Sequence, residues 1–305
     1  MKPQTLRFGD LRLTGVSRAG VETWLRVHPS GIALDVGRGD LRLAGSRHLF
    51  VTHGHLDHAL GVPYVLSQRS LHRAEATRVV CPLETAADLA AFVEAAARLE
   101  RTRYDYEIVG LEPGGRVEVG KGLAVEAFAT DHVVPSLGYH LLRRRRHLRA
   151  DLAGLSRDEL TARRQAGEEL SEETEELALS YCGDTGPAVF ALEPRLFATP
   201  VLVVECTFLG ADLRAKGTRY KHLHLDDLAA VGERFANRAL VLMHLSQRHR
   251  PEELRAAAEE RLPRLTGRIH VLCGERRGGG AEGGRRAADG GAGGEAECGE
   301  GEDER

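Results

Sequence analysis

The chain has 305 residues, enough for one domain with a large core or for two small ones. Its 42% hydrophobic and 29% charged residues are typical of a globular protein, and no apolar run approaches the ~20 residues of a membrane span. The formal net charge is −3. The segment Glu275–Arg305 has nine acidic and five basic residues and contributes −4, so residues 1–274 carry about +1. A nucleic-acid partner would therefore need a local basic patch.

The start of the chain and its cysteines predict a cytoplasmic protein. The segment Met1-Lys-Pro-Gln-Thr-Leu-Arg lacks the apolar core of a signal peptide. Five cysteines are scattered, odd in number and never in Cys-x-x-Cys spacing. Reduced thiols in the cytosol are therefore expected, with no membrane partner.

The first 45 residues predict antiparallel strands. Residues 5–45 alternate apolar and polar side chains in short runs separated by Gly and Ser. The turn that starts at Asp35 (Asp-Val-Gly-Arg-Gly) has two readings, a plain glycine turn or one that serves a site. Residues 47–52 then read as a short buried strand.

The densest motif follows that strand directly: His53-Gly-His-Leu-Asp-His58. His53 and His55 can reach one metal ion, while Asp57 and His58 lie further round the turn and suit a second. Imidazole and carboxylate together fit zinc or a similar divalent ion. The alternative, a histidine-rich solvated loop, is disfavoured because the motif comes at the end of a buried strand.

The middle of the chain predicts one helix and several strands. A helix is expected over residues 84–101 from its alanine- and leucine-rich helical spacing, and strands over 106–111, 117–119 and 123–128. His132 follows the last of these strands. Taken alone, a histidine at this place is more often structural than metal-binding.

Residues 143–178 break the strand pattern and are predicted to form an inserted arm. The arm opens with a cationic run, Arg143, Arg144, Arg145, Arg146 and Arg149. A charged, helical-looking stretch over 151–167 and an acidic stretch over 168–176 follow. One reading is a solvated excursion from the domain, since charge runs usually are solvated; the other is an arm that binds RNA through its arginines.

Three more acidic or histidine residues follow buried strands late in the chain: Asp184, Glu205 and His244. A carboxylate at the end of an apolar strand is costly unless it is paired, so Glu205 needs a partner, and His222 is the candidate. His224 is expected to cap the helix that begins near Asp226. Residues 269–273 read as a closing strand, and residues 275–305, which have no large aliphatic side chain, as a disordered tail.

From near its start to about residue 274 the chain resembles the metallo-β-lactamase superfamily. The motifs are the hexapeptide at His53, His132 with Pro-x-x-Gly-Tyr, Tyr-Cys-Gly-Asp-Thr, Glu-x-Thr-Phe and His244-Leu-Ser. Within that superfamily they resemble the short form of ribonuclease Z. The resemblance implies an α/β fold, a four-layer αββα sandwich over residues 1–274 with metals at one edge, a substrate-binding arm at 143–178 and a tail at 275–305.

The resemblance also implies a site with two zinc ions or similar divalent metals. One metal would be held by His53, His55 and His132, the other by Asp57, His58 and His244, with Asp184 bridging them. Two metals ~3.5–4 Å apart suit phosphodiester hydrolysis, because the attacking and leaving oxygens both need charge stabilisation. His222, oriented by Glu205, would protonate the leaving 3′-oxygen, and Asp57 would also orient the nucleophile.

The implied function is an endoribonuclease that removes the 3′ trailer from precursor tRNA and acts as a homodimer. Two family features are missing, an opening Phe-Leu-Gly-Thr-Gly strand and a Gly-Pro-rich arm tip. The main alternative is a phosphodiesterase of small substrates such as cyclic nucleotides, on the same metals. A non-catalytic subunit is disfavoured by the complete ligand set, and a β-lactamase or thioesterase by the pair Glu205 and His222.

Overall fold

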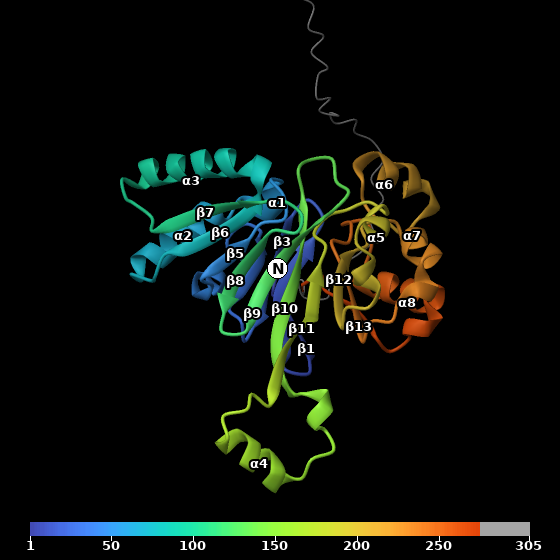
Figure 1. Cartoon of the computed structure of the whole chain (residues 1–305). Helices are drawn as coiled ribbons and strands as arrows, with labels where there is room; N and C mark the ends of the chain where they lie inside the picture. Colours follow the sequence, from blue (N-terminus) through green and yellow to red (C-terminus); the bar gives the residue numbers. More distant parts are fainter. Residues whose placement is uncertain (275–305) are drawn as a thin grey trace, which may run out of the picture.

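Two β-sheets form the centre of the fold, and the computed structural model describes residues 1–274 of it. The first sheet has seven strands in the order β1-β2-β3-β4-β5-β6-β7 (Figure 1). They are β1 (Gln4–Phe8), β2 (Leu11–Arg18), β3 (Glu22–His28), β4 (Ile32–Val36), β5 (His48–Phe50), β6 (Thr77–Pro82) and β7 (Tyr106–Leu111). The first four are antiparallel, as predicted, and β4 to β7 run parallel.

The second sheet also has seven strands, in the order β14-β13-β12-β11-β10-β9-β8. They are β8 (Arg116–Gly120), β9 (Leu123–Ala129), β10 (Leu137–Leu148), β11 (Ser171–Tyr181), β12 (Val201–Glu205), β13 (Ala239–Met243) and β14 (Ile269–Val271). β8 to β11 are antiparallel, and β11 to β14 are parallel. Every residue of β12 and β13 is buried, because helices and the other sheet cover both faces.

Helices cover the outer face of each sheet. The α-helices are α1 (Leu56–Ala59), α2 (Val62–Leu71), α3 (Ala86–Glu100), α4 (Arg157–Gln165), α5 (Val189–Leu192), α6 (Arg214–Tyr220), α7 (Leu225–Ala230) and α8 (Pro251–Arg261). Short 3₁₀ turns are η1 (Leu41–Gly45), η2 (Leu83–Thr85), η3 (Ala150–Leu152), η4 (Pro194–Phe197), η5 (Ala211–Leu213), η6 (Gly232–Arg234) and η7 (Pro263–Leu265). In Figure 1, α2 and α3 lie outside the first sheet and α5, α7 and α8 outside the second.

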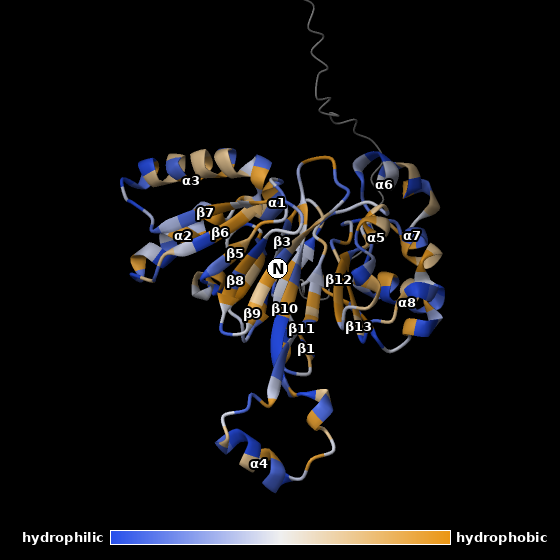
Figure 2. Cartoon of the chain, viewed as in Figure 1, coloured by the Kyte–Doolittle hydropathy of each residue, from blue (hydrophilic) through white to orange (hydrophobic). Residues whose placement is uncertain are grey.

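Three apolar clusters hold these layers together. One lies between the sheets and includes Leu13, Leu25 and Val203. A second joins the outer face of the first sheet to α2 and α3, and a third joins the second sheet to α5, α7 and α8. Figure 2 shows the apolar residues concentrated on the central strands. The arrangement is the predicted four-layer αββα sandwich, and the predicted helix over 84–101 is confirmed as η2 and α3.

The arm projects from the end of the second sheet (Figure 1). It is a two-stranded ribbon, because the outer parts of β10 and β11 pair with each other from Arg143↔Glu176 to Leu148↔Ser171. Its tip carries η3 and α4. Ser156 caps α4, and its side chain and that of Glu159 form a capping box.

The prediction that the strand pattern breaks at residue 143 was wrong. β10 continues to Leu148 and β11 begins at Ser171, so helical structure is confined to the tip. The ribbon has no apolar face, so its residues do not alternate between apolar and polar. Arginines of β10 pair instead with glutamates of β11. Hydrophobic periodicity therefore gives no signal for these strands.

Two predictions concern the limits of the chain's structure. Among residues 1–274 no helix is long and apolar enough to cross a bilayer, and the longest, α3, has 15 residues. The predicted tail, residues 275–305, lies outside the described residues.

Candidate metal centre

The predicted ligands come from the ends of strands in both sheets. His53 and His55 follow β5, His132 follows β9, Asp184 follows β11 and His244 follows β13. Asp57 and His58 lie on α1. Since parallel strands end at the same edge of a sheet, these side chains meet at one edge of the sandwich.

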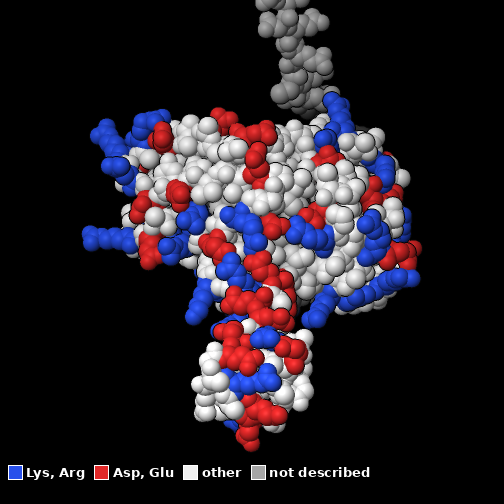
Figure 3. Space-filling model, viewed as in Figure 1, with Lys and Arg blue, Asp and Glu red and all other residues white. Residues whose placement is uncertain are grey.

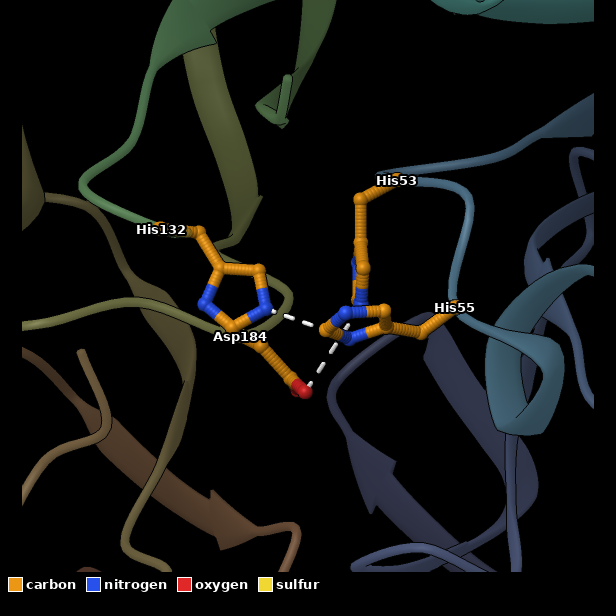
Figure 4. A group of neighbouring side chains, drawn as sticks. All are labelled: His53, His55, His132 and Asp184. Atoms are coloured by element: carbon orange, nitrogen blue, oxygen red, sulfur yellow. Dashed lines mark hydrogen bonds and ion pairs between the residues drawn. The ribbon is translucent and has the colours of Figure 1, made fainter. Parts of the chain in front are cut away.

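The first group of ligands comprises His53, His55, His132 and Asp184, which each offer one atom within 4.8 Å of the others. Figure 4 shows the three imidazoles around the Asp184 carboxylate. His132 Nε2 lies 3.3 Å from His55 Nδ1, and His53 Nε2 lies 3.8 Å from Asp184 Oδ2. Such close imidazole nitrogens can converge on one ion.

The second group comprises Asp57, His58 and His244, whose ligand atoms also lie within 4.8 Å of one another. Asp184 joins the groups, since its Oδ2 lies 3.3 Å from His58 Nε2 and 3.2 Å from His244 Nε2. The structure thus brings together all seven residues that the sequence predicted as ligands, in the predicted partition.

Unsatisfied buried atoms show that these residues fit a divalent metal. His53 Nε2, His58 Nε2 and Asp184 Oδ1 are buried and have no hydrogen-bond partner. Leaving such atoms unpaired is costly, and native proteins rarely do so without a reason. Imidazole nitrogen and carboxylate oxygen are donors for zinc and similar ions. A divalent-metal site is the consistent assignment.

A buried carboxylate, Asp35 at the end of β4, holds two of the histidines from behind. Its Oδ2 lies 2.8 Å from His58 Nδ1, and both its oxygens accept from the Thr52 hydroxyl at 3.0 Å. That hydroxyl lies 2.9 Å from His53 Nδ1, so both rings present Nε2 to the site. Tyr181 donates to Asp35 Oδ2 at 2.7 Å. The sequence left this turn undecided.

Glu205 lies at the end of β12 in the second sheet, as Asp35 lies at the end of β4 in the first. Its Oε1 lies 2.8 Å from His222 Nδ1 and accepts from the Thr185 amide at 2.8 Å. Its Oε2 accepts from the Thr207 hydroxyl, which lies 3.0 Å from His244 Nδ1. A fully buried carboxylate is thereby satisfied, and it orients one ring directly and one through a threonine.

The charged groups of the site shift the pKa values of its histidines in both directions. Burial lowers the pKa of His53 well below its usual value, which suits a neutral ligand. Burial alone would raise the pKa of Asp184, but His244 and His58 hold it well below its usual range. Burial also opposes charge on His222, but Glu205 outweighs it and raises the pKa to about 9. Burial also opposes charge on His58, but Asp184 and Asp35 outweigh it and raise its pKa well above the usual value. The direction of the shift therefore does not by itself single out His222, which lies within 4.8 Å of Asp184 and His244.

His224 is a helix cap. Its Nδ1 accepts from the Asp226 amide at 3.1 Å and its Nε2 lies 3.0 Å from the Gly210 carbonyl oxygen. It is the N-cap residue of α7. The expectation that it serves the helix rather than the metals is confirmed.

The predicted RNA-binding arginines lie on the arm, far from the metals. β10 starts near His132 and runs away from it for twelve residues, which spans ~40 Å. Figure 3 shows basic and acidic side chains mixed along the arm. The ion pairs join Arg143 to Asp10, Arg144 to Glu118 and Glu175, Arg145 to Glu176, Arg146 to Glu169 and Glu173, and Arg149 to Asp151 and Glu168.

Comparisons with known proteins agree with this geometry. A family model described as a β-lactamase superfamily domain matches residues 37–245. The tRNase Z TRZ1 of Arabidopsis thaliana is 28% identical over 274 residues, covering 89% of this chain and 98% of that protein. Ribonuclease Z of Shouchella clausii is 30% identical over 70% of this chain and 73% of its own length. The crystal structure of the human tRNase Z, short form, superposes with a TM-score of 0.56 at 18% identity, covering 86% of this chain and 95% of that one.

Proposed function

The chain belongs to the ribonuclease Z family of the β-lactamase superfamily, and on that premise we propose that it is an endoribonuclease that removes the 3′ trailer from precursor tRNA. The observation that carries the proposal is the pair formed by Glu205 and His222. A ligand cluster alone suits many hydrolases. A protonated imidazole held beside that cluster by a buried carboxylate suits a reaction with a poor leaving group, such as the 3′-oxygen of RNA.

We propose two zinc ions, or similar divalent metals, as the cofactors. His53, His55 and His132 would hold one ion and Asp57, His58 and His244 the other, with Asp184 shared between them. When bound, such a pair supplies positive charge to the attacking and leaving oxygens of an in-line displacement at phosphorus. The pKa shifts of His53 and Asp184 favour the neutral imidazole and the ionised carboxylate that metal binding needs, whereas that of His58 favours a proton that a metal ion would displace.

The residues around the cluster have separate roles in this proposal. His222 donates a proton to the leaving 3′-oxygen, and Glu205 positions the ring through Nδ1. Asp57 orients the attacking water by accepting its hydrogen bond. Its own carboxylate is fixed by the Gly20 amide, which donates to Oδ2 at 2.9 Å, so it keeps its direction as the substrate enters.

The arm arginines Arg143–Arg146 and Arg149 are proposed to contact the tRNA backbone. In the free protein each is paired with a carboxylate, so binding would exchange a carboxylate for a phosphate. Exposed ion pairs are worth only ~0–1 kcal/mol each, so the exchange is feasible, but the arm is not a preformed cationic surface. We therefore expect it to contribute less than an unpaired basic patch would.

A homodimer is proposed through an apolar stripe beside the metal centre. Leu56, Leu60 and Tyr64 recur every four residues along α1 and α2 and are 64%, 42% and 44% exposed. Monomeric proteins rarely expose contiguous apolar patches of large side chains. Replacing Leu60 with Glu should shift the sedimentation coefficient from that of a dimer to that of a monomer, and an unchanged coefficient would exclude this surface.

The remaining proposal concerns the compartment. The four described cysteines, Cys81, Cys182, Cys206 and Cys273, are buried and free. Unbridged thiols are usual in a reducing compartment. This supports a cytoplasmic location, which fractionation of cells producing the tagged chain would test.

The function is tested by mapping product ends. Purified protein is incubated with a labelled precursor tRNA and, separately, with bis-p-nitrophenyl phosphate. The proposal expects a cut at the 3′ side of the tRNA body that leaves a 3′-hydroxyl. Hydrolysis of the small ester without RNA cleavage would favour a phosphodiesterase of small substrates, and no reaction with either would favour a non-catalytic protein.

A further inference from the structure

A second group of cationic side chains lies at the same edge of the sandwich as the metal centre. It lines a pocket of about 640 Å3 between the end of β2, the segment after β13 and the end of β14. Its charged and ionisable groups are the side chains of Arg18, Arg248, His249, Arg250, Glu252 and Cys273 and the amino group of Met1, which pairs with Glu22. No residue of this pocket belongs to the metal centre or to the arm.

The pocket and the metal centre share a backbone segment. Arg18 is the last residue of β2 and forms a β-bridge with Leu245, the residue after His244. Two residues later, the Gly20 amide donates to Asp57 Oδ2. One short loop therefore lines the pocket on one side and fixes a metal ligand on the other.

The arginines of the pocket form no ion pair with a carboxylate within residues 1–274. Arg18 is 8% exposed, and its Nη2 donates to the His249 carbonyl oxygen rather than to a carboxylate. Arg248 and Arg250 are exposed, and within residues 1–274 no acidic side chain forms an ion pair with either guanidinium. Glu252 is the one carboxylate among the lining residues, and Glu253 and Asp212 lie near enough to His249 to act on its charge. None of these three carboxylates forms an ion pair with a pocket guanidinium within residues 1–274.

One further atom in the pocket lacks a partner. His249 Nε2 is out of contact with solvent and has no hydrogen bond within the described part of the chain. Unpaired guanidiniums beside an unpaired imidazole nitrogen fit an anion with several acceptor oxygens, and a phosphate group offers these.

We infer that this pocket binds a backbone phosphate of the RNA next to the scissile one. The inference rests on the proposed function, because a chain of phosphodiesters is the ligand that brings a second phosphate close to the metals. Arg18 is buried and Arg250 is exposed, and both line the pocket, so a phosphate seated there could contact a guanidinium from each. Phosphate contacts set the register of a nucleic acid on a protein, and here that register would place the scissile bond.

The test compares two arginines that are close in sequence. Arg250→Gln removes a pocket guanidinium, whereas the control, Arg255→Gln, removes the same charge from an exposed position of α8 that does not line the pocket. Equilibrium binding of precursor tRNA is measured with a chelator present, so that no cleavage occurs. We expect Arg250→Gln to weaken binding ~10-fold and to lower the salt slope by ~1, with little change for the control.

Further measurements identify the ligand and separate folding from binding. Single phosphates beside the cleavage site are replaced by uncharged methylphosphonates, and at the contacted position Arg250→Gln should cause no additional loss. Inorganic phosphate as a competitor tests whether a free anion fills the pocket instead. Arg18→Lys keeps the charge in case Arg18→Gln fails to fold, and it should bind RNA more tightly than Arg18→Gln.

The outcomes are distinct for the two proposals. If the wild type and Arg250→Gln bound equally well, or if Arg255→Gln lost as much affinity, the pocket would not be a phosphate site. Full competition by millimolar inorganic phosphate, with no methylphosphonate position sensitive, would overturn the RNA as its ligand. Cleavage of precursor tRNA with no effect of Arg250→Gln leaves the proposed function intact, whereas Arg250-dependent binding without any cleavage refutes that function alone.

Discussion

The metal centre and the arm are the two regions richest in ionisable side chains, and they differ in how these are paired. In the metal centre, His53 Nε2, His58 Nε2 and Asp184 Oδ1 are buried without partners. In the arm, every arginine from 143 to 149 faces a carboxylate, often in register across the ribbon. Both regions are equally conspicuous in the sequence.

The difference teaches that density of charge is a weak sign of function and incomplete pairing a stronger one. A surface ion pair is satisfied and contributes little, whereas a buried polar atom without a partner is costly and implies a ligand. By that criterion the pocket beside Arg18 resembles the metal centre more than the arm. Each of the following experiments changes the pairing of one region.

The largest effect is expected from Asp184→Asn. The substitution keeps the size of the side chain but removes the charge that lies within 3.3 Å of both His58 and His244 nitrogens. Metal content should fall and RNA cleavage should drop by ~10³-fold or more, since charge stabilisation by metals is worth several kcal/mol. Asp10→Asn, an acidic residue of the arm's ion pairs, is the control. If Asp184→Asn kept full activity, Asp184 would not be a metal ligand.

The next effect concerns the proton donor. His222→Ala should slow RNA cleavage ~10²–10⁴-fold without loss of metal if its ring protonates the leaving oxygen as proposed. Hydrolysis of bis-p-nitrophenyl phosphate, which has an activated leaving group, should suffer less. His224→Ala should mainly cost ~1 kcal/mol of stability through the lost helix cap, which thermal unfolding would show. Loss of metal from His222→Ala would make it a ligand instead.

Asp35→Asn should give a smaller and more selective loss. The carboxylate fixes His58 directly and His53 through Thr52, so weakening it should lower metal affinity ~10–100-fold. Competition with a chromophoric chelator measures the affinity. Tyr181→Phe removes one hydrogen bond to the same carboxylate and should have less effect. Unchanged affinity in Asp35→Asn would assign it to folding alone.

The smallest effect is expected in the arm. Replacing Arg143–Arg146 and Arg149 with Ser should raise the KM for precursor tRNA modestly and flatten its salt dependence, while the small ester is hydrolysed as before. The opposite change is more informative. Glu173→Gln with Glu175→Gln and Glu176→Gln frees Arg145 and removes one of the two carboxylates paired with Arg144 and with Arg146, and should lower that KM. If neither set of variants changes the KM, the arm does not contact RNA.

The seven residues proposed as ligands could be named from the sequence because most of them close a strong local pattern, whereas His132 was named only through the family resemblance. His53, Asp184 and His244 follow buried apolar runs, and β-strand ends need no knowledge of distant contacts. Asp35 was left undecided because its role depends on Tyr181, which is 146 residues away. The strands of the arm were missed because their register is set by charge pairs rather than by hydrophobic alternation.

The pocket beside the metal centre escaped sequence analysis for a similar reason. Arg18 and His249 are 231 residues apart and meet only because β2 reaches the segment after β13. In the sequence Arg18 is one basic residue among many. Its lack of a carboxylate partner is a property of the folded chain, and no motif reports it.

The unpaired buried atoms at the edge of the sandwich are proposed to hold a pair of metal ions. Elemental analysis of fully active protein, normalised to protein concentration, tests this proposal most directly. The account predicts close to two divalent ions per chain, lost together with activity when a strong chelator is added. One ion or none per chain in fully active protein would contradict it.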